Sequence, residues 1–223
     1  MMRGQRAEKE EDPSPLILIV DDDEAMRRSM AFLFASIGLA ARTYADAMSF
    51  LADLPGDDQL RPGAVVLDVR MPGMSGMELQ RQLQERRFPL PLLIVTGHGD
   101  VPMAVQALKA GAFDFIEKPF KEQYLLDTVA VALRHSRDRL ASRARELGIA
   151  DRLARLSRRE QEVLDGVLAG KINKVIAHEL DLSVKTVEAY RASIMVKMEA
   201  GSLPELARMV PESGSDGGRG RKV

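Results

Sequence analysis

Short apolar runs alternate with amphipathic stretches through the first 133 positions of the 223-residue chain, and later positions are amphipathic throughout. Apolar runs of about four to eight residues are typical of buried strands, whereas apolar residues repeated at helical spacing are typical of amphipathic helices. The pattern predicts strands at 16–20, 40–44 and 64–68, a fourth that ends at Thr96 and a fifth within 113–120. It also predicts helices at 24–37, 45–54, 75–86 and 101–110, and a last one from Lys121 past Leu133.

These alternating elements predict an α/β domain at residues 15–133. Strands that alternate with helices form a parallel sheet with helices on both faces. Right-handed crossovers restrict the possible topologies, and the flavodoxin-like (βα)5 fold with strand order 2-1-3-4-5 fits the chain. Residues 1–14 have no apolar face and are predicted to be disordered.

The remainder of the chain predicts a separate all-α domain of four helices. Residues 134–150 are predicted to form a helical basic linker. The stretch 134–159 contains nine arginines and three acids and is expected to be solvated rather than packed. Ser157 and Glu160 have the spacing of a capping box, which marks the start of a new helix. The domain spans 151–210, with helices at about 157–169, 173–180, 183–198 and 202–210, and 211–223 is a predicted disordered tail.

Composition narrows the class of protein. The absence of cysteine excludes disulfides, thiol catalysis and cysteine-based zinc sites. The chain has neither a secretory signal nor the ~18-residue apolar run of a membrane span, so a cytoplasmic protein without a membrane partner is expected. Residues 1–133 carry 14 Lys/Arg and 20 Asp/Glu, whereas residues 134–223 carry 18 and 13. This asymmetry suggests two modules with different partners, the second one polyanionic.

Polar residues follow four of the predicted strands at the carboxyl end of the sheet, where open parallel sheets bind ligands. They are Asp21, Asp22 and Asp23 after the first strand, Asp68 after the third, Thr96 at the fourth and Lys118 at the fifth. A single acid after a strand is often only the N-cap of the next helix. Here the first and third strands are predicted neighbours, so their acids converge and repel one another unless a cation offsets them. The pattern therefore predicts a Mg²⁺ site.

The same residues can support phosphoryl transfer. Aspartate can attack a phosphoryl group, and the transfer needs positive charge and hydrogen bonds around the phosphoryl oxygens, which Mg²⁺, Lys118 and the Thr96 hydroxyl would supply. Phosphohydrolases of the haloacid-dehalogenase type also use an aspartate at a strand end. They need a second acid two residues later, where this chain has Arg70. A turnover enzyme is therefore disfavoured, and only self-phosphorylation and self-dephosphorylation at Asp68 are expected.

The segments that carry these residues are LIVDDDEAMRRSM, VVLDVRMPGMSGMEL and PLLIVTGHGDVPMAVQALKAGAFDFIEKPF. They strongly resemble the receiver domain of two-component response regulators, and the last resembles the FixJ-type subfamily. The resemblance covers about Pro15 to Leu133 and implies that Asp68 is the phosphoacceptor. It further implies a set of Mg²⁺ ligands, which are Asp22 directly, Asp21 through water, Asp68 and the backbone carbonyl of Arg70. It implies Thr96 and Phe115 as the switch pair and Lys118, before a cis Pro119, as the phosphate-binding lysine.

The segment Asn173–Ala192 has the form of a helix-turn-helix. Ile176 and Ala177 give the first helix an apolar face, Asp181 and Leu182 form the turn, and Ser183 can cap the second helix. In such a motif the outer residues of the second helix enter the major groove of DNA.

This segment, with LSRREQEVLDGVLAGKINKVIA before it and KMEAGSLPELARM after it, resembles a LuxR/NarL-type DNA-binding domain over about Asp151 to Val210. The resemblance implies phosphate contacts from Lys174, Lys185 and Arg191 and base-facing positions at Glu188, Ala189 and Ala192. The full predicted DNA-binding set is Asn173, Lys174, Ser183, Lys185, Thr186, Glu188, Ala189, Arg191 and Ala192. Alanine reads little beyond a thymine methyl group, so specificity is expected to depend on Glu188, on DNA shape or on half-site spacing. A helix-turn-helix used only for protein contacts is the alternative.

Together the resemblances imply a response regulator that acts as a DNA-binding transcription factor. A sensor histidine kinase would phosphorylate Asp68, Thr96 and Lys118 would move toward the phosphate, and Phe115 would fill the vacated space. The change would alter the Val101–Glu117 face, through which a homodimer is expected to form on promoter DNA, with RNA polymerase as a further partner. A regulator that works without phosphorylation is the main alternative.

Overall fold

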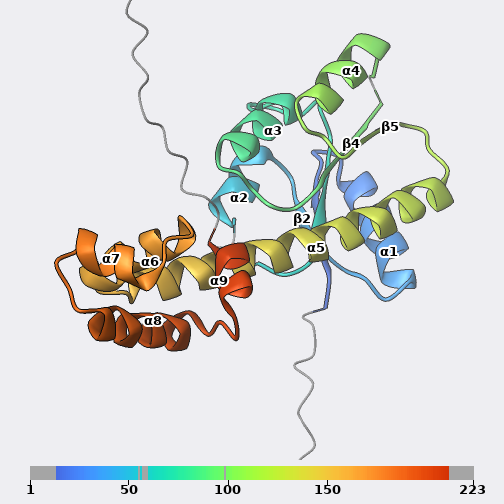
Figure 1. Ribbon diagram of the computed structural model, residues 1–223. Coiled ribbons are helices and arrows are strands. Elements are labelled where there is room, and N and C mark those ends of the chain that lie inside the picture. Colours follow the sequence, from blue (N-terminus) through green and yellow to red (C-terminus); the bar gives the residue numbers. More distant parts are fainter. Residues whose placement is uncertain (1–13, 55, 57–59, 98, 211–223) are drawn as a thin grey trace, which may run out of the picture. The chain divides into compact units, whose positions relative to one another are not determined.

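The computed structural model describes residues 14–54, 56, 60–97 and 99–210. The two segments predicted to be disordered lie outside these ranges, apart from Ser14. The chain divides into two compact units between Ser142 and Arg143, and Figure 1 shows the elements of each.

The first unit contains a five-stranded parallel sheet. Its strands are β1 (Leu16–Val20), β2 (Ala40–Tyr44), β3 (Gly63–Leu67), β4 (Leu92–Thr96) and β5 (Asp114–Glu117). They lie in the order β2-β1-β3-β4-β5, which confirms the predicted flavodoxin-like topology. All four neighbouring pairs are parallel, because each strand returns to the sheet through a helical crossover.

Helices cover both faces of this sheet (Figure 1). They are α1 (Glu24–Ser36), α2 (Ala47–Ala52), α3 (Gly76–Glu85), α4 (Val101–Lys109) and α5 (Glu122–Ala154). One apolar core packs α2, α3 and α4 against the strands and buries Phe50 and Leu79. A second core packs α1 and α5 against the opposite face and buries Phe34 and Leu125. Full burial of such side chains contributes roughly 1.5–3 kcal/mol each, so both faces stabilise the sheet.

Strand β3 begins and ends one residue earlier than the apolar pattern predicts. It opens at Gly63, where a Cβ atom would lie 2.3 Å from the carbonyl oxygen of Leu16. Glycine therefore allows β1 and β3 to approach, although glycine in a sequence usually indicates a loop. Asp68 follows the strand directly, and its N–H still donates to the carbonyl of Val20 at 2.8 Å. Asp68 thus stands at the carboxyl end of the sheet.

Aspartate N-caps set the starts of α1 and α2. Asp46 accepts the N–H of Ser49 at 2.8 Å, so α2 begins at Ala47 and is shorter than the predicted 45–54. Asp23 caps α1 in the same way, by accepting the N–H groups of Ala25 and Met26. Each cap satisfies backbone N–H groups that have no partner inside the helix.

Helix α5 continues without a break from the first unit into the second. Its 33 residues include the whole stretch predicted as a basic linker, so the predicted helix is confirmed. The expectation that this stretch is solvated rather than packed holds for most of its residues, which are exposed, but not for all of them. Ser136 is fully buried and its hydroxyl accepts the N–H of Gly63 at 3.0 Å, while Ile149 and Leu153 pack against the core of the second unit. Small and apolar residues recur at helical spacing among the arginines, and these are the residues that pack.

Within the described part of the chain, the second unit adds four helices, as predicted, to the end of α5. They are α6 (Arg158–Leu168), α7 (Asn173–Glu179), α8 (Val184–Met198) and α9 (Leu203–Met209). The capping box at Ser157 and Glu160 is present with both of its hydrogen bonds. Val163, Ile176 and Met198 are buried in the core of this unit. Among the described residues, the helices include none that is both long and apolar enough to cross a membrane.

Candidate functional site

The carboxyl ends of β1 and β3 bring two carboxylates to one place. Val20 and Leu67 are partners in the parallel register, and Asp21 and Asp68 follow them directly. Asp21 is 1% exposed and Asp68 is 9% exposed, so both charges are largely removed from water. Burying neighbouring like charges is costly unless positive charge compensates them.

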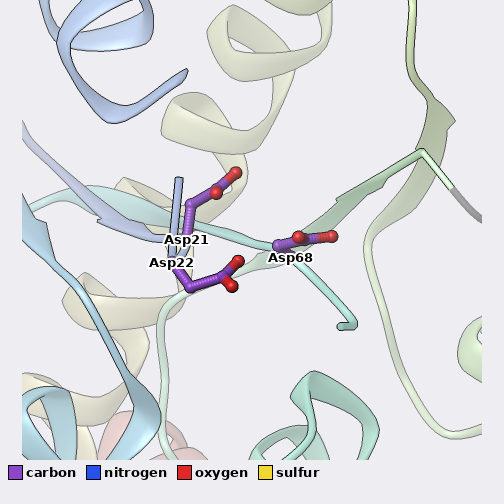
Figure 2. A group of neighbouring side chains, drawn as sticks. All are labelled: Asp21, Asp22 and Asp68. Atoms are coloured by element: carbon purple, nitrogen blue, oxygen red, sulfur yellow. The ribbon is translucent and has the colours of Figure 1, made fainter. Parts of the chain in front are cut away.

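Asp22 completes a group of three carboxylates. One oxygen atom from each of Asp21, Asp22 and Asp68 lies within 4.8 Å of the other two, and Figure 2 shows the three side chains gathered at the strand ends. Burial raises the pKa of Asp21 above its usual value, although a hydrogen bond from Lys118 counteracts the effect. Converging carboxylate oxygens suit a hard divalent cation such as Mg²⁺. The three side chains predicted as metal ligands therefore lie together and fit that ion.

Lys118 reaches this group from the end of β5. Its Nζ atom lies 2.7 Å from Asp21 Oδ2 and 3.7 Å from Asp68 Oδ2, and its side chain is 14% exposed. The backbone N–H of Lys118 donates to the carbonyl of Thr96 at 2.8 Å. The peptide bond to Pro119 is cis, as the resemblance implied. Lys118 is therefore placed to balance the charge of either carboxylate.

The turn after β3 orients the Asp68 carboxyl group. Asp68 Oδ1 accepts the N–H of Val69 at 2.8 Å, and the Gly76 N–H donates to the Val69 carbonyl at 2.8 Å. A Cβ atom on Gly76 would lie 2.1 Å from the Asp68 carbonyl oxygen, so glycine allows α3 to begin this close to the site. No local pattern in the sequence predicts this role of Gly76. Ser75 caps α3 by accepting the Glu78 N–H at 3.3 Å.

Thr96 and Phe115 lie on the same face of the sheet. Phe115 pairs with Ile94 in the register of β4 and β5, two residues before Thr96, and side chains two residues apart share a face. Thr96 is fully buried, whereas Phe115 is half-buried against the core. Gly99 lies beside both, because a Cβ there would be 2.8 Å from Phe115 Cε1 and 3.7 Å from Thr96 Cγ2. Both predicted switch residues thus lie close to Gly99.

The side chains of Asp23 and Arg70 lie outside the group of three carboxylates. Asp23 Oδ1 accepts the N–H groups of Ala25 and Met26, so this acid is a helix cap. Asp23 is not one of the three residues whose carboxylate oxygens converge. The Arg70 side chain is exposed, and the position two residues after Asp68 carries no acid. A ligand role for the Arg70 carbonyl stays a prediction.

Helices α7 and α8 form a helix-turn-helix. The Leu182 N–H donates to the Ala177 carbonyl at 2.8 Å across the turn, and Asp181 adopts a left-handed conformation with φ 53°. Ser183 accepts the N–H of Thr186 at 3.0 Å and so caps α8. Val187 is fully buried and holds α8 against the core of the unit.

The residues predicted to contact DNA differ in exposure. Exposed members are Lys174, Ser183, Lys185, Glu188, Ala189 and Ala192, and half-buried members are Asn173, Thr186 and Arg191. Arg191 donates a hydrogen bond to Asn173 Oδ1, which ties α8 to the first residue of α7. No local sequence pattern predicts this pair, because the two residues are 18 positions apart. Arg191 is therefore held in place before any DNA contact.

A buried carboxylate joins α6 to α8 in the same unit. Glu160 is 4% exposed and accepts hydrogen bonds from Lys197 Nζ at 2.7 Å, Ser193 Oγ at 2.6 Å and the Ser157 N–H at 2.7 Å. These bonds, led by the one from Lys197, lower the pKa of Glu160 to about 2. The capping-box pattern indicated only the bond to Ser157, since Ser193 and Lys197 carry no sequence signal for this contact.

Two families match the chain. Residues 17–130 match the family described as "Response regulator receiver domain", and residues 154–210 match "Bacterial regulatory proteins, luxR family". The first match covers the sheet with its helices, and the second covers the helix-turn-helix.

Known proteins resemble the chain over both matched regions. "Transcriptional regulatory protein FixJ" of Bradyrhizobium diazoefficiens is 48% identical over 198 residues, which cover 89% of this chain and 95% of that protein. The solved structure of the response regulator StyR is 39% identical with a TM-score of 0.77, covering 88% of this chain and 98% of its own. The crystal structure of full-length FixJ from B. japonicum is 48% identical with a TM-score of 0.53, covering 87% and 94%.

Replacing Gly99 by alanine is expected to destabilise the first unit by about 1 kcal/mol, the low end of the usual cost of overpacking, because the half-buried Phe115 ring can shift in part. The added Cβ would lie 2.8 Å from Phe115 Cε1, whereas a Cβ on Gly97 would meet only Lys118 Cβ, at 3.9 Å. Gly97→Ala is the control and should change the free energy of unfolding by less than about 0.5 kcal/mol. Adding Phe115→Leu to Gly99→Ala should recover part of the loss. Urea denaturation followed through the NMR signals of Tyr44 and Tyr124 measures these changes, and equal losses in both glycine variants would contradict the packing.

Replacing Glu160 by glutamine is expected to lower the free energy of unfolding of the second unit by about 2 kcal/mol at neutral pH, since it removes a charged hydrogen-bond acceptor. The pKa of Glu160 is lowered from 4.5 to about 2 by folding. Its stabilisation is therefore complete above the unfolded pKa and is lost as pH falls from about 4.5 to about 2. The difference between wild type and Glu160→Gln should shrink over that range.

The NMR signals of Tyr190 report unfolding of this unit in urea. Glu162→Gln is the control, because Glu162 makes ion pairs with the exposed Arg158 and Arg159 and such pairs contribute less than about 1 kcal/mol. A pH-independent difference between wild type and Glu160→Gln would show that the carboxylate charge is not what stabilises the unit.

Proposed function

The chain belongs to the response regulators that join a receiver domain to a LuxR-type DNA-binding domain, and on this basis we propose that Asp68 is its phosphoacceptor. It is a transcription regulator of a two-component system, and regulation by phosphorylation and dimerisation follows from the family. The observation that carries the proposal is the convergence of Asp21, Asp22, Asp68 and Lys118 at the carboxyl end of the sheet.

The hydrogen-bond partners of the three carboxylates favour Asp68 as the nucleophile over Asp21 and Asp22. Asp21 is 1% exposed, and its two oxygens accept from Lys118 Nζ and from the Asp23 N–H. Asp68 Oδ1 accepts from Val69, while its Oδ2 lies 3.7 Å from Lys118 Nζ, beyond hydrogen-bond distance. Asp68 therefore offers an oxygen that is close to a cation and not yet bonded to it. Asp22 is exposed and suits a metal ligand better than a nucleophile held in place.

The proposed reaction transfers a phosphoryl group from a histidine of a sensor kinase. An Asp68 oxygen attacks the phosphorus, an O–P bond forms, the N–P bond breaks, and the histidine nitrogen leaves with the bonding electrons. When bound, Mg²⁺ supplies positive charge next to the phosphoryl oxygens; Asp21, Asp22, Asp68 and the Arg70 carbonyl would hold it. Lys118 Nζ would donate to a phosphoryl oxygen. Water attack on the same phosphorus would return Asp68 to the carboxylate, and the chain needs no other catalytic turnover.

Thr96 and Phe115 would connect this event to the rest of the receiver domain. The Thr96 hydroxyl would move to donate to the phosphoryl group, and Phe115, half-buried beside it, would occupy the space that Thr96 leaves. This exchange would alter the Val101–Glu117 face, on which two phosphorylated copies would pair. The energetics are a shift between two existing conformations, driven by the stronger hydrogen bonding of one of them to the phosphate.

The helix-turn-helix would place α8 in the major groove of promoter DNA. Lys174, Lys185 and Arg191 would contact phosphates, and Arg191 is supported there by Asn173. Glu188, Ala189 and Ala192 are exposed on α8 and would face the bases, while Ser183 and Thr186 lie at the start of α8. A DNA-bound dimer in the cytoplasm, acting on RNA polymerase, completes the proposal.

Asp68→Asn is expected to abolish labelling of the full-length protein by a ³²P-phosphorylated kinase or by acetyl phosphate, because an amide cannot replace the carboxylate nucleophile. Removing divalent cations with EDTA should have the same effect. Asp23→Asn is the matched control, since asparagine also caps helices well, and it should be labelled like wild type. Continued labelling of Asp68→Asn would show that another residue accepts the phosphate.

Lys185→Ala is expected to weaken binding to specific and unrelated DNA by a similar factor and to reduce the slope of log K against log salt by about 1. Glu188→Gln should instead change the preference among DNA sequences. Lys171→Ala is the control, because Lys171 is paired with Glu179 outside the predicted contact set. Fluorescence anisotropy with labelled promoter DNA over a range of salt concentrations measures these effects. If Lys171→Ala lost binding while Lys185→Ala did not, DNA would contact a surface other than the predicted one.

A further inference from the structure

A cleft of about 490 Å³ lies at the amino ends of β4 and β5, at the opposite end of the sheet from Asp68. Its lining comes from α3, from the segments that lead into the two strands and from α5. We propose that this basal cleft binds a small organic anion that carries an acidic group on an apolar body. Its volume is within the range of about 300–1,000 Å³ that is common for small-molecule sites.

The inner surface of the basal cleft is apolar. Leu90, Pro91 and Leu92 line it and are buried. Phe113 and His135 add a wall of two rings whose centroids are 5.6 Å apart, tilted by 50°. Such a surface favours the apolar part of a ligand, because contact removes both from water.

The rim of the basal cleft is positively charged. Arg87 and Arg139 line it with exposed side chains, and the described lining residues include no aspartate or glutamate. A guanidinium group binds carboxylate, sulfonate or phosphate oxygens through paired N–H groups. An apolar surface beside two such groups matches an amphipathic anion better than a neutral molecule or a cation.

Arg87 has a backbone conformation that normally favours glycine. Its φ is 52°, and its N–H donates to the Gln84 carbonyl while the Phe88 N–H donates to the Leu83 carbonyl, both at 2.9 Å. This is the turn that ends α3, and its left-handed position disfavours residues with a Cβ atom.

Gln80 contributes a polar atom that lacks a partner. It is 3% exposed, and its Nε2 donates to the carbonyls of Ala107 and Ala110 at 2.8 and 3.0 Å, which closes the end of α4. Its Oε1 has no hydrogen-bond partner among the described residues. Buried polar atoms are nearly always paired. A hydroxyl or water donor brought into the basal cleft would therefore give Gln80 Oε1 a hydrogen-bond partner.

Because α5 is one continuous helix, a ligand in the basal cleft would contact the same helix that leads into the second unit. His135 and Arg139 lie beyond Leu133, where the predicted receiver domain ends, and they line the cleft because α5 continues as a helix to Ala154. A ligand that binds them stabilises the helical state of the segment that leads into the DNA-binding unit. The basal cleft would thus be a second input, separate from phosphorylation of Asp68.

The test uses the full-length protein and two dyes that differ in charge. 8-Anilinonaphthalene-1-sulfonate is an amphipathic anion, and N-phenyl-1-naphthylamine is its neutral counterpart without the sulfonate. The anion is expected to bind at one site per chain and to shift the backbone NMR signals of Gly111 and Phe113. The neutral dye should bind at least about tenfold more weakly, the factor expected when one charged hydrogen bond is lost.

Two variants probe the rim without touching the core. Arg139→Gln removes one guanidinium group and Gln84→Glu adds a carboxylate at an exposed position, so each should weaken binding of the anion about tenfold or more. Arg134→Gln, on the same helix but outside the lining, should bind within about twofold of wild type. Asp68→Asn should bind like wild type, which separates this proposal from the one on phosphorylation.

Three results would overturn the proposal. The anion and the neutral dye could bind equally well, which would mean apolar contact only. Arg134→Gln could weaken binding as much as Arg139→Gln, which would mean general attraction to a basic helix. The Gly111 and Phe113 signals could stay unchanged while the dye binds, which would place the dye elsewhere.

Discussion

The receiver unit depends on the compensation of buried carboxylate charge by the Lys118 ammonium group. Its Nζ atom lies 2.7 Å from Asp21 and 3.7 Å from Asp68, and both acids are largely removed from water. The strand order makes this possible, because β1 and β3 are neighbours and β5 pairs with β4, where the Lys118 N–H bonds to the Thr96 carbonyl. Compensation remains incomplete, as burial still raises the pKa of Asp21. The site therefore favours further positive charge, which is the condition for holding a cation and a phosphoryl group.

Each unit contains a buried carboxylate, and the surroundings shift the pKa of the two groups in opposite directions. Glu160 accepts hydrogen bonds from Lys197, Ser193 and Ser157, and its pKa falls to about 2. A carboxylate with this many donors is stable and unreactive, so it fixes α6 to α8 below the helix-turn-helix. Burial raises the pKa of Asp21 despite its hydrogen bond from Lys118, and the nearby Asp68 charge adds to the rise. The balance between burial and hydrogen-bond donors around each carboxylate separates a structural group from one that is prepared for a ligand.

Much of the fold and of the carboxylate site could be predicted from local patterns. The apolar periodicity places the elements, and the rule that ligands bind at the carboxyl ends of parallel strands identifies Asp21, Asp68 and Lys118. The errors occur where a residue acts through a distant partner. Gly76 is needed because α3 approaches the Asp68 carbonyl, and Ser136 is buried because it accepts the N–H of Gly63, 73 positions away. Such contacts have no periodicity and leave no local signal.

The succession of strands and helices along the chain, the acids at the strand ends and the helix-turn-helix follow from local sequence, because each depends on residues that are adjacent or one turn apart. The packing of these elements selects which charged groups compensate one another. It brought Lys118 to Asp21 across 97 positions, paired Arg191 with Asn173 and placed Arg87 and Arg139 around one cleft. The energies of these contacts depend on distance and on exclusion from water, and both exist only after the strands and helices have packed.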